Sequence, residues 1–203
     1  MIVPMTTFAL VASISPGPVN LVGLSTGSRH GLTKGLIFVT GATTGFILLF
    51  LAVGYGLSSL FMVIANFERW LSWAGIIFLL YLSYRLAFDN GEIEIESQSQ
   101  KAPVMEHGHK SANFWTGFLM QWLNPKAWLA SAAGISAYTQ GGDLAQTWLF
   151  AMIYLPVCWI SLICWVCVGV YLRQKVQEPK VMRAINRSLA AMLAGSCLFL
   201  VFG

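Results

Sequence analysis

The sequence predicts an all-α integral membrane protein with six membrane-spanning helices, and three observations lead to this fold class. The chain of 203 residues is 57% hydrophobic and only 10% charged, with a mean hydropathy of +0.69. Such a composition leaves too little polar surface to cover a soluble domain of this length. Long apolar runs recur along the chain, and most of the basic residues lie between them.

The six predicted spans follow from the length of these runs. An α-helix rises about 1.5 Å per residue, so a span needs about 20 mostly apolar residues. The stretches that meet this requirement are 3–24, 35–57, 71–88, 113–137, 144–171 and 185–202. The third and sixth are short, and we expect them to tilt less or to begin earlier. Because the first 28 residues contain no Lys or Arg, the first run is expected to stay as a span rather than serve as a cleaved signal peptide.

Basic residues are distributed unevenly between the two sides of the predicted bundle. In or beside the segments that follow the first, third and fifth runs lie Arg29, Lys34, Arg85, Lys101, Lys110, Arg173, Lys175, Lys180, Arg183 and Arg187. The opposite segments hold only Arg69. By the positive-inside rule, the basic segments face the cytoplasm and both termini face outside. The net charge of +4 is therefore attributed to topology, and no nucleic-acid partner is expected.

Residues 89–112 are rich in Glu, Ser, Gln and Lys, and they predict a flexible cytoplasmic loop between the units 1–88 and 113–203. His107 and His109 in this loop lack a third ligand, so no metal site is expected. The four cysteines lie inside apolar runs, where we expect small buried hydrophobes and not a disulfide framework.

The first run contains Ser15-Pro16-Gly17-Pro18 near its centre. Proline has no backbone donor, and its ring clashes with the preceding helical turn, so the chain is expected to leave helical geometry here. Non-helical backbone at membrane depth is tolerated only inside protein or beside a water-filled cavity. This motif therefore predicts a broken first helix that faces a cavity.

The fourth run carries a second such motif, Asn-Pro-Lys at 124–126. Pro125 follows Pro16 by 109 positions, and the same offset separates Gly35 from Leu144, where the second and fifth runs begin. Each unit of three spans thus opens with a proline-broken helix. Because three is odd, the second unit crosses the membrane in the opposite sense, as an inverted repeat. Matched interrupted helices indicate a transporter with its substrate site near the midplane.

Lys126 would cost at least about 2.5 kcal/mol as an ion in the bilayer core, and no Asp or Glu lies within any predicted span to pair with it. A substrate carboxylate would supply the missing charge, assisted by half-helix N-termini and by two asparagine amides. In the alternative interpretation, Lys126 snorkels to an interface or lies at the end of a half-helix. The predicted substrate-binding residues are Ser15, Pro16, Gly17, Pro18, Asn20, Asn124, Pro125 and Lys126.

Four motifs together give the chain a family resemblance. They are SPGPVN in the first run, Gly41 and Gly45 in the second, WLSWAGIIFLLYLSYRLA in the third and NPKAWL in the fourth. In this order they resemble the LysE/RhtB superfamily of bacterial amino-acid exporters over nearly the whole chain. Val19 departs from the first motif, because many relatives have a second polar residue there. The glycine pair is expected to allow close helix packing rather than ligand contact.

The resemblance implies a bacterial inner-membrane secondary transporter that has no cofactor and exports an amino acid driven by the proton gradient. The absence of acidic residues from the predicted spans argues against a cationic side chain, so a small neutral or sulfur-containing amino acid is expected. Transport is expected to proceed by alternating access. Lys126 is one candidate for the proton-coupling group. The lipid bilayer is the other partner, and a homodimer remains open.

Two other functional classes are also consistent with an apolar helical chain. A membrane-embedded enzyme would need a nucleophile, an acid–base pair or a metal cluster near a membrane face, whereas the histidines and carboxylates here lie in the polar loop or singly. A channel or structural subunit would need no pair of broken helices at matched positions.

Overall fold

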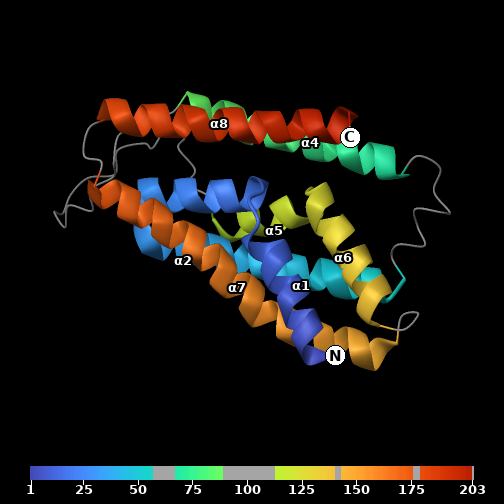
Figure 1. The fold of residues 1–203 in the computed structure, drawn as a ribbon. Coiled ribbons are helices and arrows are strands. Elements are labelled where there is room, and N and C mark those ends of the chain that lie inside the picture. The colour runs from blue at the N-terminus through green and yellow to red at the C-terminus, as the bar shows by residue number, and fades with distance from the viewer. Residues whose placement is uncertain (57–66, 89–112, 140–142, 176–178, 203) are drawn as a thin grey trace, which may run out of the picture.

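The computed structural model describes residues 1–56, 67–88, 113–139, 143–175 and 179–202. The helices in this part are α1 (Ile2–Ile14), α2 (Pro18–Gly54), α4 (Phe67–Ala87), α5 (Phe114–Trp122), α6 (Pro125–Tyr138), α7 (Leu144–Lys175) and α8 (Pro179–Phe202) (Figure 1). All regular structure in the described residues is helical, which confirms the all-α prediction. The predicted polar loop at 89–112, with His107 and His109, lies outside the described residues.

The helices extend beyond some of the predicted apolar runs. α7 begins at Leu144, where the fifth run begins, whereas α8 begins at Pro179, ahead of its run at 185–202. Proline suits the first helical position, because the N–H that it lacks would have no partner inside the helix. Hydropathy marks only the apolar part of such a helix, so its polar first turns are missed.

α2 reverses direction at Gly31, which has φ 79° and ψ −174°. A Cβ atom built on Gly23 would lie 3.6 Å from the ring of Phe38. In a straight helix these residues would be about 22 Å apart along the axis. The element is therefore a hairpin of two helical arms, 18–30 and 32–54.

This reversal is tighter than the sequence predicted. The predicted runs 3–24 and 35–57 left residues 25–34 between them, but both arms remain helical up to the turn. A single residue is enough because glycine has no Cβ and adopts a positive φ without the steric penalty that other residues incur.

Membrane character is visible in both the length and the surface of the helices. Among the described residues, α2 and α7 each contain a stretch that is long and apolar enough to cross a membrane, and α1 is a shorter apolar helix. Large apolar side chains are exposed on several elements, including Val3 at 75%, Leu129 at 69% and Met152 at 65%. Such a surface is unfavourable in water and is suited to hydrocarbon.

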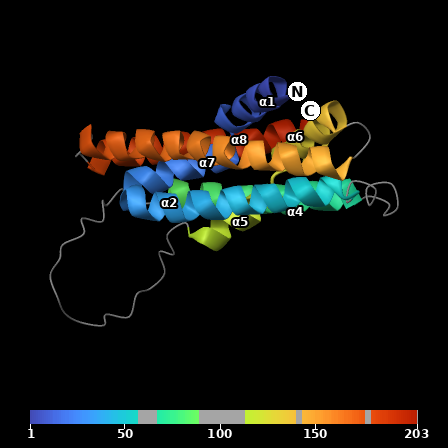
Figure 2. The ribbon, with the colours of Figure 1, turned by 90° about the horizontal axis from the view of Figure 1, so that it is seen from below.

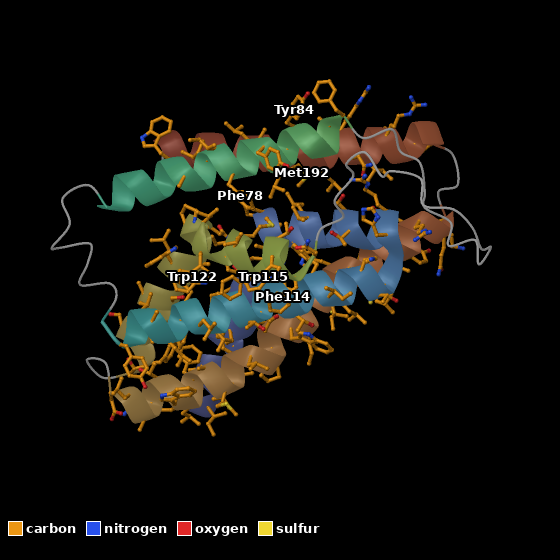
Figure 3. The ribbon with its side chains drawn as sticks, turned by 180° about the vertical axis from the view of Figure 1, so that it is seen from behind. Phe78, Tyr84, Phe114, Trp115, Trp122 and Met192 are labelled. Atoms are coloured by element: carbon orange, nitrogen blue, oxygen red, sulfur yellow. The ribbon has the colours of Figure 1, made fainter. Side chains whose placement is uncertain are left out.

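α2 is the centre of the bundle and packs most extensively against α7 and α5. In Figure 2, α1 lies outside α7 and α5 lies outside α2, on opposite faces of the α2–α7 pair. α4 and α8 pair with each other, and the Ser83 hydroxyl donates to the Ala190 carbonyl at 2.8 Å. Seen from behind, this pair lies beside α5, with Phe78 on α4 and with Trp115 and Trp122 on α5 (Figure 3).

Glycines allow α2 and α5 to approach closely. A Cβ atom at Gly41 would overlap the carbonyl group of Phe114, and one at Gly45 would lie 2.6 Å from the carbonyl oxygen of Phe118. The predicted packing role of this glycine pair is therefore confirmed. Small residues at such contacts are the usual way for membrane helices to bring their backbones together.

We predict that Gly41→Ala destabilises the protein by about 1–3 kcal/mol, because the added methyl group cannot fit against the α5 backbone. Thermal unfolding of the detergent-purified protein, followed by tryptophan fluorescence, measures the loss as a lower Tm. Gly195→Ala on α8 is the matched control, since a Cβ atom there meets nothing within 4 Å. Equal Tm values for the two variants would contradict the packing role.

Candidate functional site

The junction between α1 and α2 lacks two backbone donors. In a continuous helix, Pro16 and Pro18 would bond to the carbonyls of Ala12 and Ile14, but proline has no N–H. The Ser15 hydroxyl donates to the Ala12 carbonyl at 3.1 Å instead. The indole Nε1 of Trp165, on α7, donates to the Ile14 carbonyl at 3.1 Å. Side chains thus replace the donors that the prolines remove.

The same junction also turns the peptide of Gly17 away from the helix. Gly17 is extended, with φ −169° and ψ 175°, so its N–H does not continue the helical bonding pattern. The Asn20 side-chain amide donates to the Ser13 carbonyl at 2.9 Å. The N–H of Leu21 donates to the Gly17 carbonyl at 3.0 Å and starts the next helix.

The junction between α5 and α6 also depends on an asparagine and a tryptophan. Asn124 caps α6, because its side-chain oxygen accepts from the N–H of Lys126 at 3.2 Å. The indole Nε1 of Trp128 donates to the Trp122 carbonyl at 2.8 Å. The N–H of Asn124 donates to the Gln121 carbonyl at 3.3 Å. An asparagine and a tryptophan therefore supply donors or acceptors at both junctions.

Lys126 connects the two junctions across 111 positions of sequence. Its ammonium donates to the carbonyl oxygen of Ser15 at 2.8 Å and to the Ser15 hydroxyl at 2.9 Å, and it lies 3.5 Å from the Pro16 carbonyl oxygen. Lys126 belongs to the first turn of α6, where the partial positive charge of the helix disfavours a cation. Its amine reaches the C-terminal end of α1 instead, where the partial charge is negative.

Neutral oxygens, rather than a carboxylate, are thus the partners of Lys126. Sequence reasoning considered only ionised partners and found none. The sequence also allowed an alternative interpretation, in which Lys126 lies at the end of a half-helix. Lys126 does lie there, in the first turn of α6. Gly17 leaves room for the amine, since a Cβ atom there would lie only 3.2 Å from Nζ.

A cavity of about 40 Å³ lies beside these contacts. This volume holds about two or three water molecules. No Asp or Glu side chain of the described residues lines it, and its polar lining comes from Ser13, Asn20, Gln121, Asn124, Lys126, Tyr154 and Cys158. The lining thus offers amides, hydroxyls, a thiol and one cation.

The structure places the predicted site residues in three groups around this cavity. They are the lining residues Asn20, Asn124 and Lys126, the neighbours of the amine Ser15, Pro16 and Gly17, and the first residues of α2 and α6, Pro18 and Pro125. In the described part of the chain, no group of three His, Cys, Asp or Glu side chains is placed to hold a metal ion.

Sequence reasoning missed the wall of the cavity that α7 provides. Tyr154 and Cys158 line it, together with Ser13 from α1. The signal was present in the spacing, because Tyr154, Cys158 and Ser161 recur on one face of an otherwise apolar helix. All three side chains are buried.

The cysteines only partly follow the prediction that they are buried. Cys158 is buried, but Cys164 and Cys167 are exposed, and all three are free thiols. The expectation of burial was wrong for the latter two because hydrocarbon outside the protein is as apolar as its core. An apolar run therefore does not distinguish a core face from a lipid face.

Aromatic rings adjoin the α7 wall and connect four helices. The ring centroids of Phe46 and Tyr154 are 4.6 Å apart, and those of Phe50 and Phe150 are 5.1 Å apart. The complete cluster contains Phe8, Phe46, Phe50, Tyr138, Phe150 and Tyr154. Because Phe46 and Tyr154 also line the cavity, this cluster bounds one of its sides.

An apolar helical bundle with an amine held between two proline junctions has the features of a membrane transport protein. The family model of LysE type translocators matches residues 10–203, so the chain belongs to the LysE family. It is similar to the cysteine/O-acetylserine efflux proteins of Escherichia coli (strain K12) and Shigella sonnei (strain Ss046). Each is 27% identical over 163 residues, covering 75% of this chain and 77% of the relative. No solved structure matches the chain.

We predict that Trp165→Phe lowers the free energy of unfolding by about 1–3 kcal/mol, because the Ile14 carbonyl loses its donor and hydrocarbon offers no replacement. Trp159→Phe, also on α7, is the matched control, since its indole makes only a 3.4 Å contact with the Thr40 hydroxyl. Tm measurements on both variants in detergent test this. A Trp165→Phe variant as stable as the control would show that the indole bond is dispensable.

Proposed function

We propose that this protein is a secondary transporter of the bacterial inner membrane that exports a small neutral or sulfur-containing amino acid. The observation that carries this proposal is the Lys126 ammonium, held between two proline junctions beside a small polar cavity. A half-buried cation without a carboxylate partner suits the carboxylate of a substrate. The efflux names of the relatives support the same substrate class.

In the proposed topology, α1 and the first arm of α2 form one span interrupted at 15–17. α5 and α6 form another, interrupted at 123–124, and the second arm of α2, α4, α7 and α8 are the remaining four. The placement of α1 outside α7 and of α5 outside α2 supports an inverted pair of repeats, 1–88 and 113–203. Two copies related by a pseudo-two-fold axis would place their opening helices in this way.

Basic residues support an orientation for this bundle. The α2 turn, the end of α7 and the start of α8 lie at one end of the molecule, at the left of Figure 1. These segments include Arg29, Lys34, Arg173 and Lys175. We infer that this end faces the cytoplasm and that both termini face the periplasm.

The proposed substrate contacts use the predicted site residues. The substrate carboxylate would accept a hydrogen bond from Lys126 and would lie near the N-terminal end of α6, where the partial charge of the helix is positive. The described lining contains no carboxylate to receive a second cation, which favours a neutral side chain. The cavity of about 40 Å³ must widen to admit an amino acid, and rocking of one repeat against the other would accomplish this.

We assign proton coupling to the cation at the cavity. Lys126 is the one cationic side chain in the described lining, and it can release and regain a proton as its partners change. An exporter needs such a step if the proton gradient is to drive the amino acid outward.

Export itself is the first test. Proteoliposomes loaded with radiolabelled O-acetylserine, cysteine, serine or lysine should release the neutral amino acids when a pH gradient is imposed, and should retain lysine. Lys126→Ala should slow release at least about tenfold, because a charged hydrogen bond to the substrate is lost.

Lys34→Ala is the matched control, because Lys34 is exposed at the α2 turn. Release by Lys126→Ala at the control rate would remove this lysine from the mechanism. A current that does not saturate with amino acid would indicate a channel instead.

A second prediction concerns orientation. Alkaline phosphatase, which is active only outside the cytoplasm, should be active when fused after residue 203 and inactive when inserted at 89–112. This pattern is expected because the basic residues gather in the predicted loops on one side, which the positive-inside rule places in the cytoplasm. A fluorescent protein that matures only in the cytoplasm is the control and should give the reverse pattern. The opposite pattern in both reporters would show that the termini face the cytoplasm and would contradict the proposed topology.

A further inference from the structure

The oxygens that receive the Lys126 ammonium form a compact group at the end of α1. An ammonium has three donors, and three oxygens surround it: the Ser15 carbonyl at 2.8 Å, the Ser15 hydroxyl at 2.9 Å and the Pro16 carbonyl at 3.5 Å. They lie where the negative end of the α1 dipole adds to the attraction. Gly17 keeps the position open, since a Cβ atom there would approach the nitrogen to 3.2 Å.

These oxygens differ from the other carbonyls of the junction. Ser13 and Ile14 accept from Asn20 and Trp165, whose side chains are fixed on α2 and α7. The Ser15 and Pro16 carbonyls accept from the end of a flexible lysine chain. If that chain turned away, both oxygens would be open to another donor, either water or a ligand.

We propose that the Ser15 and Pro16 oxygens are a binding site for a primary ammonium, and that the α-ammonium of the substrate replaces Lys126 there. The released Lys126 then pairs with the α-carboxylate of the same molecule. This inference rests on the proposed function and adds the mode by which a zwitterionic α-amino acid binds.

The arrangement explains how one lysine serves a substrate with two charges. The ammonium and carboxylate of an α-amino acid are attached to the same carbon, so their partners must be neighbours. Lys126 and the Ser15 oxygens are in contact. Movement of the lysine chain also adds its own volume to a cavity that it now lines.

The first experiment measures ammonium binding without transport. In purified Lys126→Ala, the oxygens lose their internal donor, so methylammonium chloride should raise Tm by mass action. The wild-type protein, whose own amine fills the site, should not respond. Tetramethylammonium chloride at the same concentration is the control, because it has the charge but no N–H donor. No rise in Lys126→Ala, or an equal rise with tetramethylammonium, would overturn the proposed site.

The second experiment uses the wild-type protein and does not depend on the folding of a variant. In proteoliposomes, the transported amino acid should compete with its own labelled form, and its N-acetyl derivative should compete at least about tenfold more weakly, since it has no ammonium. Equal competition by the two would overturn the exchange.

The two experiments also separate this inference from the proposed function. Stabilisation by methylammonium without any amino-acid transport would retain the ammonium site and reject the exporter. Transport with equal competition by the N-acetyl derivative would retain the exporter and reject the exchange.

Discussion

The bond from the Lys126 ammonium to the Ser15 carbonyl is the contact on which the rest of the site depends. It can form only because the chain leaves helical geometry at Ser15, which frees this carbonyl from its usual helical donor. It also joins the C-terminal end of α1 to the N-terminal end of α6, so the two proline junctions lie together. A cation that would be unfavourable at the start of its own helix is stabilised by the end of another.

The bilayer imposes a second constraint, because it contains no water to satisfy exposed backbone groups. Both junctions meet it with the same residue types: Asn20 and Trp165 at the first, and Asn124 and Trp128 at the second. These side chains hold irregular backbone in place without filling the space beside it. A small polar cavity can therefore persist within an apolar bundle.

Close packing of α2 supplies the rigid frame for this arrangement. Gly31 folds it into two arms, and Gly41 and Gly45 bring its second arm against α5. The cavity then lies where α1, α2, α6 and α7 meet, next to the aromatic cluster. A lining of amides, hydroxyls and one amine, with no carboxylate among its described residues, is chemically matched to a neutral amino acid, which is the class that the proposed function requires.

The sequence by itself determined the helical class, the positions of both proline junctions and the packing role of Gly41 and Gly45, because these depend on local properties such as hydropathy, missing donors and side-chain size. Only the tertiary structure decided that Lys126 meets Ser15, that Trp165 caps α1, and that Cys158 lines a cavity whereas Cys164 faces outward. These outcomes depend on how distant helices are placed and rotated. Hydropathy does not encode that rotation, since lipid and protein core are equally apolar.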